Sequence, residues 1–458
     1  MIRLFNVYYP TRKIVLFSGE LLIVCSSFVA AIVIRLGQDY ILMLKYENGI
    51  YKILGITLLA MVCLDALDLY DLDRIPSRTE TYFRLLAVMG VLSFLLAGLE
   101  YLFPRLLPGN NTLVVGLSIL TLALLVWRSL HTWLLRLPLL RERIYVLGEG
   151  ERASRLVRAL RSRPELGMDV AGWSRETGGG PSTCEALGSH LVVLVTSAQV
   201  DHVIVALNDR RGVLPVRELL GLRLRGIKVE EATGLLERIS GKIEVDGLYP
   251  SWLVFAQGFR LKPEHLIFQR IFGFVASLAC LVVFLPLFPL IALAVKLSSP
   301  GPIFYRQRRV GHGGRLFFCY KFRSMRQDAE ATSGAIWAGD NDPRITSVGK
   351  WLRRTRLDEL PQLWNVLRGD MGFVGPRPER PEFVTWLTRE IPYYQLRHII
   401  RPGITGWAQV CYSYSGSLEE SREKLKYDLY YIKNISLSLD LVIILRSIKI
   451  VLLGRGAR

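Results

Sequence analysis

The sequence contains only six cysteines in 458 residues, and none of them forms a C-x-x-C pair. This spacing argues against a disulfide framework and against a zinc site, and it fits a reducing compartment. Acidic residues are also scarce, with 40 Asp and Glu against 58 Lys and Arg, a formal net charge of +18. Such a balance suits anionic lipid, nucleic acid or phosphorylated substrates. The chain shows no nucleic-acid-binding motif, so we expect no nucleic acid among its partners.

Long apolar runs dominate the first part of the chain. Hydrophobic residues make up 51% of the sequence and the mean hydropathy is +0.29, which indicates a membrane protein. Four runs, at 14–35, 52–70, 85–103 and 112–135, each approach the about 20 residues that cross a bilayer as a helix. We therefore predict that residues 1–140 form a four-helix transmembrane domain.

Basic residues set the orientation of these helices. They lie before the first run, between the second and third, and after the fourth, at Arg12, Lys13, Arg78, Arg84, Arg141 and Arg143. Because lysine and arginine remain on the cytoplasmic side, both ends of the domain are expected in the cytoplasm. No cleavable signal peptide is expected, since the first run is long and lacks a small-residue cleavage site. Glu20 lies inside that run, and Asp65 and Asp68 lie near the end of the second run. Acids within a membrane can mark a functional site, and the alternative for Asp65 and Asp68 is that they reach water.

Residues 141–260 read as alternating strands and helices, which predicts a Rossmann-like parallel α/β domain. "RIYVLGEGERASRLVRAL" is a strand, a glycine turn and a helix, and residues 200–207 form a further strand. Gly148 and Gly150 belong to a partial G-x-G-x-x-A motif that can place a phosphate at a helix N-terminus. The alternative is a tight turn in a structural or regulatory domain. Glu176 only loosely represents the acidic partner of such a motif.

A fifth apolar run, at 271–297, is long enough to span a bilayer but has basic residues on both flanks. Pro286 lies inside it, where proline removes a backbone hydrogen bond and bends a helix. We predict a re-entrant helix that breaks at Pro286 and returns to the same face. We predict that residues 261–458 form this re-entrant helix and a catalytic domain. Within that domain, the segments 424–434 and 439–454 are either amphipathic helices in the membrane interface or core helices.

The segment "RRTRLDELPQLWNVLRGDMGFVGPRPERPEF" places Asp358 and Glu359 side by side. We predict a helix from Pro361 to a stop at Gly369, with both carboxylates at its N-terminus. Neighbouring residues do not share a helix face, so one carboxylate can face a phosphorus atom and the other a metal. The alternative is a solvated helix face.

A carboxylate can attack a phosphoryl group when cations neutralise the approach to an anionic diphosphate. The candidate cations are Lys321, Arg323, Arg353, Arg354, Arg356 and Arg377, the last held between two prolines. Mg²⁺, bound by Glu359 and substrate oxygens, would supply the remaining positive charge. Weaker candidates are Asp340 and Asp342 as metal ligands, and His312 and His398 as catalytic groups.

Together, "SSPGPIFYRQRRVG", "YKFRSM", "LDELPQLWNVLRGDMGFVGPRPERPEF" and "RPGITGWAQV" resemble the bacterial sugar transferases, the monotopic phosphoglycosyl transferases. The resemblance covers about 265–458, and the complete arrangement is similar to the long form of that family. The ending "KYDLYYIKNISLSLDL" looks like the subgroup found with exosortase-linked exopolysaccharide systems. One departure is Leu285, where the family often has serine before the proline that matches Pro286.

The resemblance implies a reaction. A UDP-sugar donates hexose-1-phosphate to undecaprenyl phosphate, UMP leaves, and surface-glycan assembly begins at the cytoplasmic face of the bacterial inner membrane. Asp358 matches the family's nucleophile, Glu359 its Mg²⁺-binding partner, and Lys321, Arg353 and Arg377 its basic site residues. The hexose and the oligomeric state, including a homodimer, stay open. The alternatives from the residues alone are a non-catalytic membrane scaffold, a nucleotide-sensing component, and an oxidoreductase acting through Gly148 and Gly150.

Overall fold

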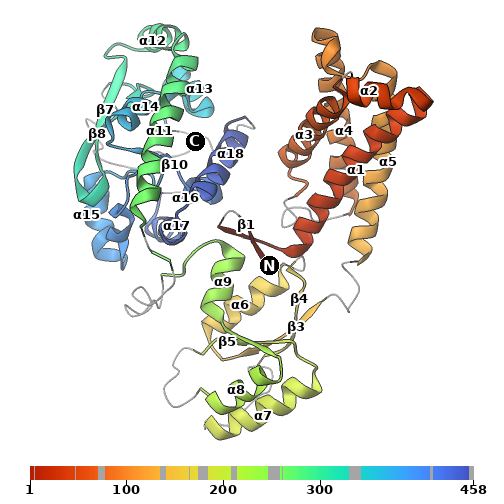
Figure 1. Cartoon of the computed structure of the whole chain (residues 1–458). Coiled ribbons are helices and arrows are strands. Elements are labelled where there is room, and N and C mark those ends of the chain that lie inside the picture. The colour runs from red at the N-terminus through yellow and green to blue at the C-terminus, as the bar shows by residue number, and fades with distance from the viewer. Residues whose placement is uncertain are drawn as a thin grey trace. The chain divides into compact units, whose positions relative to one another are not determined.

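The computed structural model describes the chain except residues 5, 47, 71–77, 135–140, 164–165, 174–183, 208–213, 246–257, 260, 328, 330–341, 413–415 and 453–458. It divides into two compact units (Figure 1). Unit 1 consists of Met1–Ile2 and Tyr9–Leu235, and unit 2 of Arg3–Tyr8 and Leu236–Arg458. The short strands β1 (Ile2–Leu4) and β2 (Val7–Tyr9) pair with each other near the N-terminus.

Apolar helices form the first part of unit 1. They are α1 (Thr11–Leu36), α2 (Tyr40–Tyr46), α3 (Gly49–Ala66), α4 (Arg78–Leu102) and α5 (Asn110–Leu134). Helix α1 packs on α3 and α5, and α4 packs on the same two helices. The four long helices are each long and apolar enough to cross a membrane. The predicted apolar helices are therefore present, and the chain is a membrane protein with a helical N-terminal region.

Glu20 lies inside this helical group and is completely buried. Its Oε1 accepts a hydrogen bond of 2.7 Å from Nε of Arg128 on α5, and the Arg128 guanidinium also lies over the Tyr70 ring. A buried charge is tolerated when a charge of opposite sign lies beside it. The pair joins α1 to α5, which favours a structural reading of the Glu20 carboxylate.

The second part of unit 1 is the α/β region. In chain order it contains β3 (Glu142–Leu147), α6 (Glu151–Arg161), β4 (Met168–Trp173), α7 (Cys184–Ser197), β5 (His202–Val205), α8 (Val216–Leu224) and β6 (Lys228–Glu231), followed by α9 (Ala232–Ser240). The sheet order is β4-β3-β5-β6, and every pair is parallel. The predicted parallel α/β arrangement is confirmed. Strand β4, which lies between the predicted strands in the chain, is additional.

The glycine turn connects β3 to α6, as the motif predicts. Gly148 has φ +145°, and a Cβ there would lie 2.6 Å from the Ala206 carbonyl carbon, so no side chain fits. Gly150 has φ +93° and immediately precedes α6. The indole Nε1 of Trp173 donates to the Gly148 carbonyl at 2.8 Å. The geometry suits either reading of the motif, and Glu176 lies outside the described residues.

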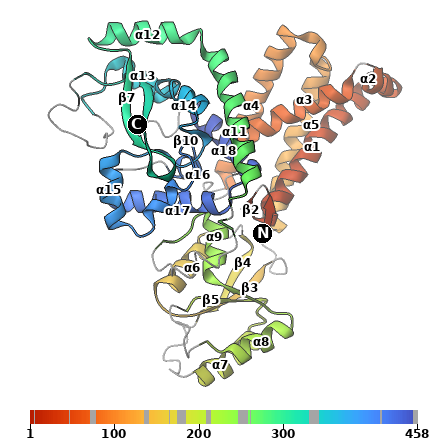
Figure 2. The same cartoon turned by 60° about the vertical axis from the view of Figure 1, so that its left-hand side comes forward.

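Unit 2 begins with two apolar helices that meet at Pro286. Helix α11 (Pro263–Phe284) ends two residues before α12 (Leu287–Ser298) begins. Figure 2 shows α12 continuing in a different direction from α11. Proline has no N–H to donate to the preceding turn, so the helical hydrogen bonding is interrupted where the sequence predicts. The predicted break is confirmed, and α11 begins earlier than the predicted run.

The rest of unit 2 surrounds the segment that carries the two carboxylates. Strands β7 (Phe304–Val310) and β8 (Leu316–Phe322) form an antiparallel hairpin, and β9 (Gly372–Val374) pairs in parallel with β10 (Gly403–Thr405). The helices are α13 (Ser347–Thr355), α14 (Gln362–Arg368), α15 (Pro381–Glu390), α16 (Trp407–Cys411), α17 (Leu418–Lys433) and α18 (Leu437–Leu452).

Helices α17 and α18 correspond to the two C-terminal segments that the sequence predicts as either interfacial or core helices, and they differ in burial. On α17, Leu425, Leu429 and Tyr431 are almost completely buried, and even Lys426 is buried in an ion pair with Glu244. Helix α17 is therefore a core helix of unit 2. Helix α18 buries Leu439 and Ile443 but exposes Leu441, Leu445 and Ile448, so it keeps an uncovered apolar face.

Candidate active site

A short 3-10 turn, Leu357–Glu359, presents the two carboxylates between α13 and α14. Arg356 reverses the chain direction before the turn, in the left-handed region at φ +59°. Pro361 then precedes α14, which begins at Gln362, and Gly369 ends the helix at φ +94°. The predicted helix and its glycine stop are confirmed, with the start one residue later than expected.

Neither carboxylate is solvated. Asp358 is 6% exposed and Glu359 is 8% exposed. An ionised carboxylate loses its hydration when it is buried, so it requires nearby cations or donors. The solvated-face alternative for this pair is therefore wrong.

Cations from three segments surround Glu359. Its Oε1 lies 2.7 Å from Nζ of Lys321 on β8, 2.5 Å from Nη2 of Arg377 and 3.9 Å from Nη1 of Arg356. Burial on its own would raise the pKa of the Glu359 carboxyl. The charges of Arg377, Lys321 and Arg356 outweigh burial and hold this pKa well below its usual range. This environment favours the ionised form of Glu359.

Asp358 differs from its neighbour in both contacts and charge. Its Oδ1 is buried and has no hydrogen-bond partner among the described residues. Burial, and then the negative charge of Glu359, raise the pKa of the Asp358 carboxyl, while Lys321, Arg353 and Arg356 oppose that rise. A buried oxygen without a donor is unusual in a folded protein. A perturbed carboxyl of this kind is typical of a reacting group.

Arg353 approaches the carboxylates from α13. Its Nε donates to Oγ of Ser324 at 2.9 Å, which fixes the guanidinium beside the turn. Burial lowers the pKa of Arg353, and the charges of Asp358, Asp342 and Glu359 raise it. Arg353 is thus one of the cations that act on Asp358.

Arg323 has a different position from the one expected of a phosphate-binding residue. Its guanidinium donates to the carbonyls of Ser299 at 2.6 Å, Pro300 at 2.8 Å and Val295 at 3.3 Å. These carbonyls lie at and just beyond the C-terminal end of α12, where backbone acceptors lack helical partners. Arg323 is 6% exposed and holds the end of α12, whereas Lys321 alone of the two reaches Glu359.

The weaker candidates have other roles or lie elsewhere. The carboxylate of Asp342 pairs with Arg344 at 2.5 Å and accepts from the Arg344 backbone N–H, so it closes a turn. Burial, and then the nearby Arg397, lower the pKa of His398 to about 4. His312 is exposed in the turn of the β7–β8 hairpin, and Asp340 lies outside the described residues. In the part of the chain that the structure describes, no cluster of three or more His, Cys, Asp and Glu could hold a metal.

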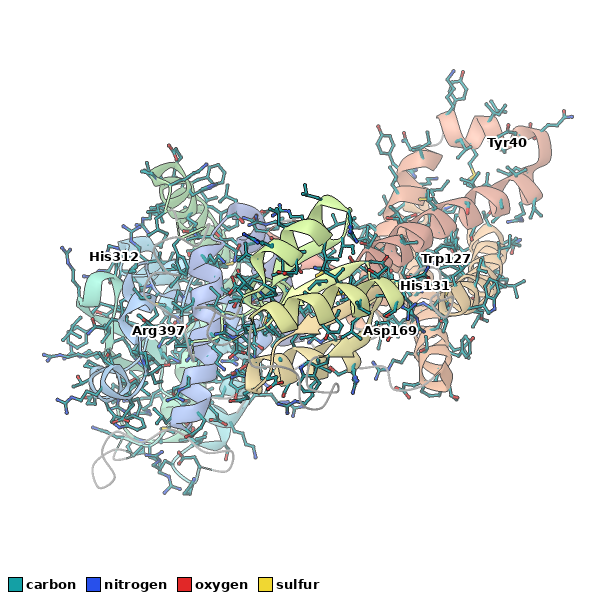
Figure 3. All side chains as sticks on the ribbon, turned by 90° about the horizontal axis from the view of Figure 1, so that it is seen from below. Tyr40, Trp127, His131, Asp169, His312 and Arg397 are labelled. Atoms are coloured by element: carbon teal, nitrogen blue, oxygen red, sulfur yellow. The ribbon has the colours of Figure 1, made fainter. Side chains whose placement is uncertain are left out.

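The backbone that carries Arg377 is held from two sides. Nη2 of Arg397 donates to the Arg377 carbonyl at 3.0 Å, and Nη1 of Arg309 donates to the Pro378 carbonyl at 3.0 Å. Figure 3 places Arg397 within the body of unit 2, where it is 3% exposed and pairs with Asp428 at 2.9 Å. The sequence reading missed Arg397. Arg397 precedes His398 in "RHIIRPG", and an arginine in such a segment is a signal for a charged contact.

A second ion pair extends this support. Oε1 of Glu379, two residues after Arg377, lies 2.5 Å from Nζ of Lys424 on α17. Burial would raise the pKa of Glu379, but Lys424, Arg397 and Arg309 lower it to about 2. The loop after β9 is therefore anchored to the core of unit 2 by charged groups rather than by apolar packing alone.

Comparisons with known proteins agree on one family. The model described as "Bacterial sugar transferase" matches residues 264–454. The chain is 44% identical over 243 residues to a UDP-N-acetylgalactosamine-undecaprenyl-phosphate N-acetylgalactosaminephosphotransferase of Aeromonas hydrophila, covering 53% of this chain and 56% of that protein. It is 33% identical over 365 residues to an undecaprenyl-phosphate glucose phosphotransferase of Komagataeibacter xylinus, covering 76% of this chain and 68% of that protein.

A third relative is matched almost along its whole length. It is the exopolysaccharide production protein PSS of Rhizobium leguminosarum bv. phaseoli, 43% identical over 185 residues, covering 39% of this chain and 92% of that protein.

The Arg397–Asp428 pair generates a prediction about stability. Replacing Arg397 with glutamine leaves the Asp428 carboxylate buried without its cation, so the free energy of unfolding should fall by about 3–5 kcal/mol. Denaturant unfolding of the purified protein in detergent measures this change. The matched control is Arg389→Gln on the exposed side of α15, where a change within about 0.5 kcal/mol is expected. Equal stability of the two variants would contradict the anchoring role.

Proposed function

Because this chain belongs to the bacterial sugar transferase family, we propose that it transfers hexose-1-phosphate from a UDP-sugar to undecaprenyl phosphate and releases UMP. The product would start the assembly of an exopolysaccharide or another surface glycan, and the chain's ending favours an exosortase-linked system. The observation that carries the proposal is the buried pair in which Oδ1 of Asp358 has no hydrogen-bond partner among the described residues and Oε1 of Glu359 is paired with cations. The relatives name different sugars, N-acetylgalactosamine and glucose, so no hexose is proposed.

Two displacements at phosphorus make up the proposed reaction. A carboxylate oxygen of Asp358 attacks the β-phosphorus of the donor, the bond to the bridging oxygen breaks, and UMP leaves. The sugar phosphate is then linked to Asp358. A phosphate oxygen of undecaprenyl phosphate attacks the same phosphorus, the aspartate is released, and a lipid-linked sugar diphosphate forms. Dividing the transfer in this way replaces one difficult step by two easier ones.

Cations make the first approach possible, since a carboxylate and a diphosphate repel each other. Lys321 and Arg377 hold Glu359 and would be shared with the diphosphate oxygens when the donor binds. Arg353 lies beside Asp358 and favours its ionised form. Arg323 is left out of this set because three backbone carbonyls occupy its guanidinium.

Mg²⁺ is the cofactor we propose for this site. Mg²⁺ binds through one or two carboxylates plus substrate phosphate oxygens, and the Glu359 carboxylate, next to the proposed nucleophile Asp358, fits that donor set. Oε1 of Glu359 carries the short ion pairs, whereas Oε2 has only a 3.4 Å contact with Arg377, so Oε2 is the oxygen left for a metal. Bound there, the ion would neutralise charge on the diphosphate.

The membrane arrangement we propose has residues 1–140 as a four-helix transmembrane domain in the bacterial inner membrane. Residues 141–260 and 261–458 would then lie on the cytoplasmic face, with α11 and α12 re-entering that face at the Pro286 break. The apolar length of α11 and the separate direction of α12 support this arrangement (Figure 2).

The re-entrant arrangement predicts that both ends of the α11–α12 pair are on one side. Single cysteines are placed at Glu264 and Arg315 in a cysteine-free background and treated with a membrane-impermeant maleimide. Both should be labelled in inverted vesicles and protected in intact spheroplasts. Labelling of the two positions from opposite sides would show that the helices span the bilayer.

The nucleophile predicts a trapped intermediate. Wild-type enzyme treated with UDP-sugar, without acceptor, should release up to one UMP per active site and gain the mass of a sugar phosphate on the peptide containing Asp358. Asp358→Asn should show neither, because an amide cannot act as the attacking oxygen anion. Chelation of Mg²⁺ should suppress the UMP burst of the wild type. Product formation at wild-type rate by Asp358→Asn would remove the proposed mechanism.

The raised pKa of Asp358 predicts an unusual acid limit of activity. The attacking carboxylate must be ionised, so kcat/KM should fall as pH decreases through this raised pKa, above the usual range of aspartate. Arg353→Gln removes a cation that lowers the pKa of Asp358, so the acid limb should move to higher pH. The cations around Glu359 hold its pKa well below the usual range, so the acid limb is assigned to Asp358.

Lys350→Gln, on the exposed side of the same helix α13, is the matched control for that shift. It should leave the acid limb in place. An acid limb that does not move in Arg353→Gln, or that moves equally in both variants, would contradict the role of Arg353.

A further inference from the structure

Unit 2 contains a pocket that the proposed chemistry has not yet used. Helix α11, helix α14, strand β9, the residues just before β10 and Asp440 of α18 line it. Its walls are mainly apolar, with Leu266 and Phe272 from α11, Val366 from α14 and Phe373 from β9. Apolar pockets with a few polar groups at the edge are the usual form of a small-molecule or lipid site.

Two arginines line this pocket, and only one of them is engaged by the protein. Arg270 donates to the carbonyls of Val366 and Leu367, the latter at 2.7 Å, and so closes the C-terminal end of α14. Arg401 is exposed and makes no hydrogen bond or ion pair with any residue that the structure describes. The pocket therefore offers one uncommitted cation beside apolar walls.

The acidic residue of the pocket is already satisfied. Oδ1 of Asp440 accepts a hydrogen bond of 2.6 Å from the Tyr431 hydroxyl, and Oδ2 accepts one of 2.7 Å from the Gln269 amide. Both carboxylate oxygens are thus used within the protein. The positive charge of Arg401 remains available to a ligand.

The pocket shares its elements with the site of the two carboxylates. Val366 lies on α14, the helix that begins directly after Asp358 and Glu359. Strand β9 leads through Gly375 to Arg377, and a Cβ on Gly375 would lie only 2.4 Å from the Arg401 carbonyl oxygen. The backbone of Arg401 therefore touches the chain two residues before the arginine that pairs with Glu359.

We propose that this pocket binds the polyprenyl phosphate acceptor, with its first isoprenoid units between α11 and β9 and its phosphate on Arg401. This inference rests on the proposed function. An isoprenoid chain suits the apolar walls, and a phosphate complements a lone guanidinium. Helix α11 is long and apolar enough to lie in a membrane, so the isoprenoid chain can extend along it from the bilayer to the pocket.

Two substitutions test the pocket by different means. Arg401→Gln removes the phosphate contact. Gly273→Leu fills the space, because a Cβ at Gly273 meets only ordinary contacts of 3.5–3.6 Å with Phe373 and Val366 and a longer side chain extends further. Arg368→Gln, an exposed arginine on α14 outside the pocket lining, is the matched control.

Steady-state assays of the full chain in nanodiscs should separate acceptor from donor. We expect Arg401→Gln and Gly273→Leu to raise KM for undecaprenyl phosphate at least tenfold, with KM for UDP-sugar and the acceptor-free UMP burst unchanged. The retained burst shows that each variant is folded. Arg368→Gln should match the wild type. Unchanged acceptor KM in both pocket variants would overturn the pocket while leaving the transferase reaction intact.

A binding experiment decides the pocket even without turnover. A polyprenyl phosphate with a diazirine on its first isoprenoid unit is photolysed with the wild type in nanodiscs, and the labelled peptides are identified. Labelling should fall on α11 and β9, and Gly273→Leu should abolish it. Labelling elsewhere, or equal labelling by a photoreactive phosphatidic acid, would overturn the assignment. If the probe labels the pocket but the protein never releases UMP from a UDP-sugar, the proposed transferase reaction is rejected and the lipid-binding pocket is supported.

Discussion

The ion pairs of Glu359 hold the candidate site together. Its buried Oε1 joins Lys321 at the end of the β7–β8 hairpin to Arg377 in the loop after β9, segments that are 56 residues apart in the chain. Neither cation would remain in place without a buried anion between them, because like charges repel strongly at low dielectric. Arg397 and Arg309 then fix the backbone around Arg377. Geometry at the carboxylates thus depends on charged groups that reach into the core.

The same surroundings shift the pKa values of the two adjacent carboxyl groups in opposite directions. Glu359 takes the short contacts with the cations, so its pKa falls, while Asp358 is buried beside that negative charge and its pKa rises. A carboxylate whose ionised form is favoured suits the binding of cations. Oδ1 of Asp358, which has no donor among the described residues, retains its lone pairs for an electrophile. The proposed division between a metal ligand and a nucleophile follows from this asymmetry.

The end of strand β8 connects the apolar helices of unit 2 to the site. Lys321 reaches Glu359, and Arg323, two residues later, holds the carbonyls at the end of α12. A shift of α12 would therefore displace strand β8, which carries Lys321. In the motif "YKFRSM", Arg323 therefore has a structural role, whereas Lys321 contacts Glu359.

Local patterns in the sequence determined much of this protein: the apolar helices, the break at Pro286, the parallel α/β order and the helix that stops at Gly369. Each depends on neighbouring residues, through hydropathy, proline geometry or glycine conformation. Strand β4 was not predicted, since none of its side chains is buried and its sequence, MDVAGW, carries no continuous apolar run. Glu20 could not be assigned because its partner, Arg128, lies on another helix.

Tertiary structure alone decided which charged residues meet. Lys321 and Arg323 are both basic and two residues apart, yet one contacts Glu359 and the other the carbonyls that follow α12. Arg397 and Arg401 belong to one motif, yet one is buried against Asp428 and the other is exposed in the pocket lining. Charge pairing depends on distance in space, and spacing along the chain carries that information only within a helix or a strand.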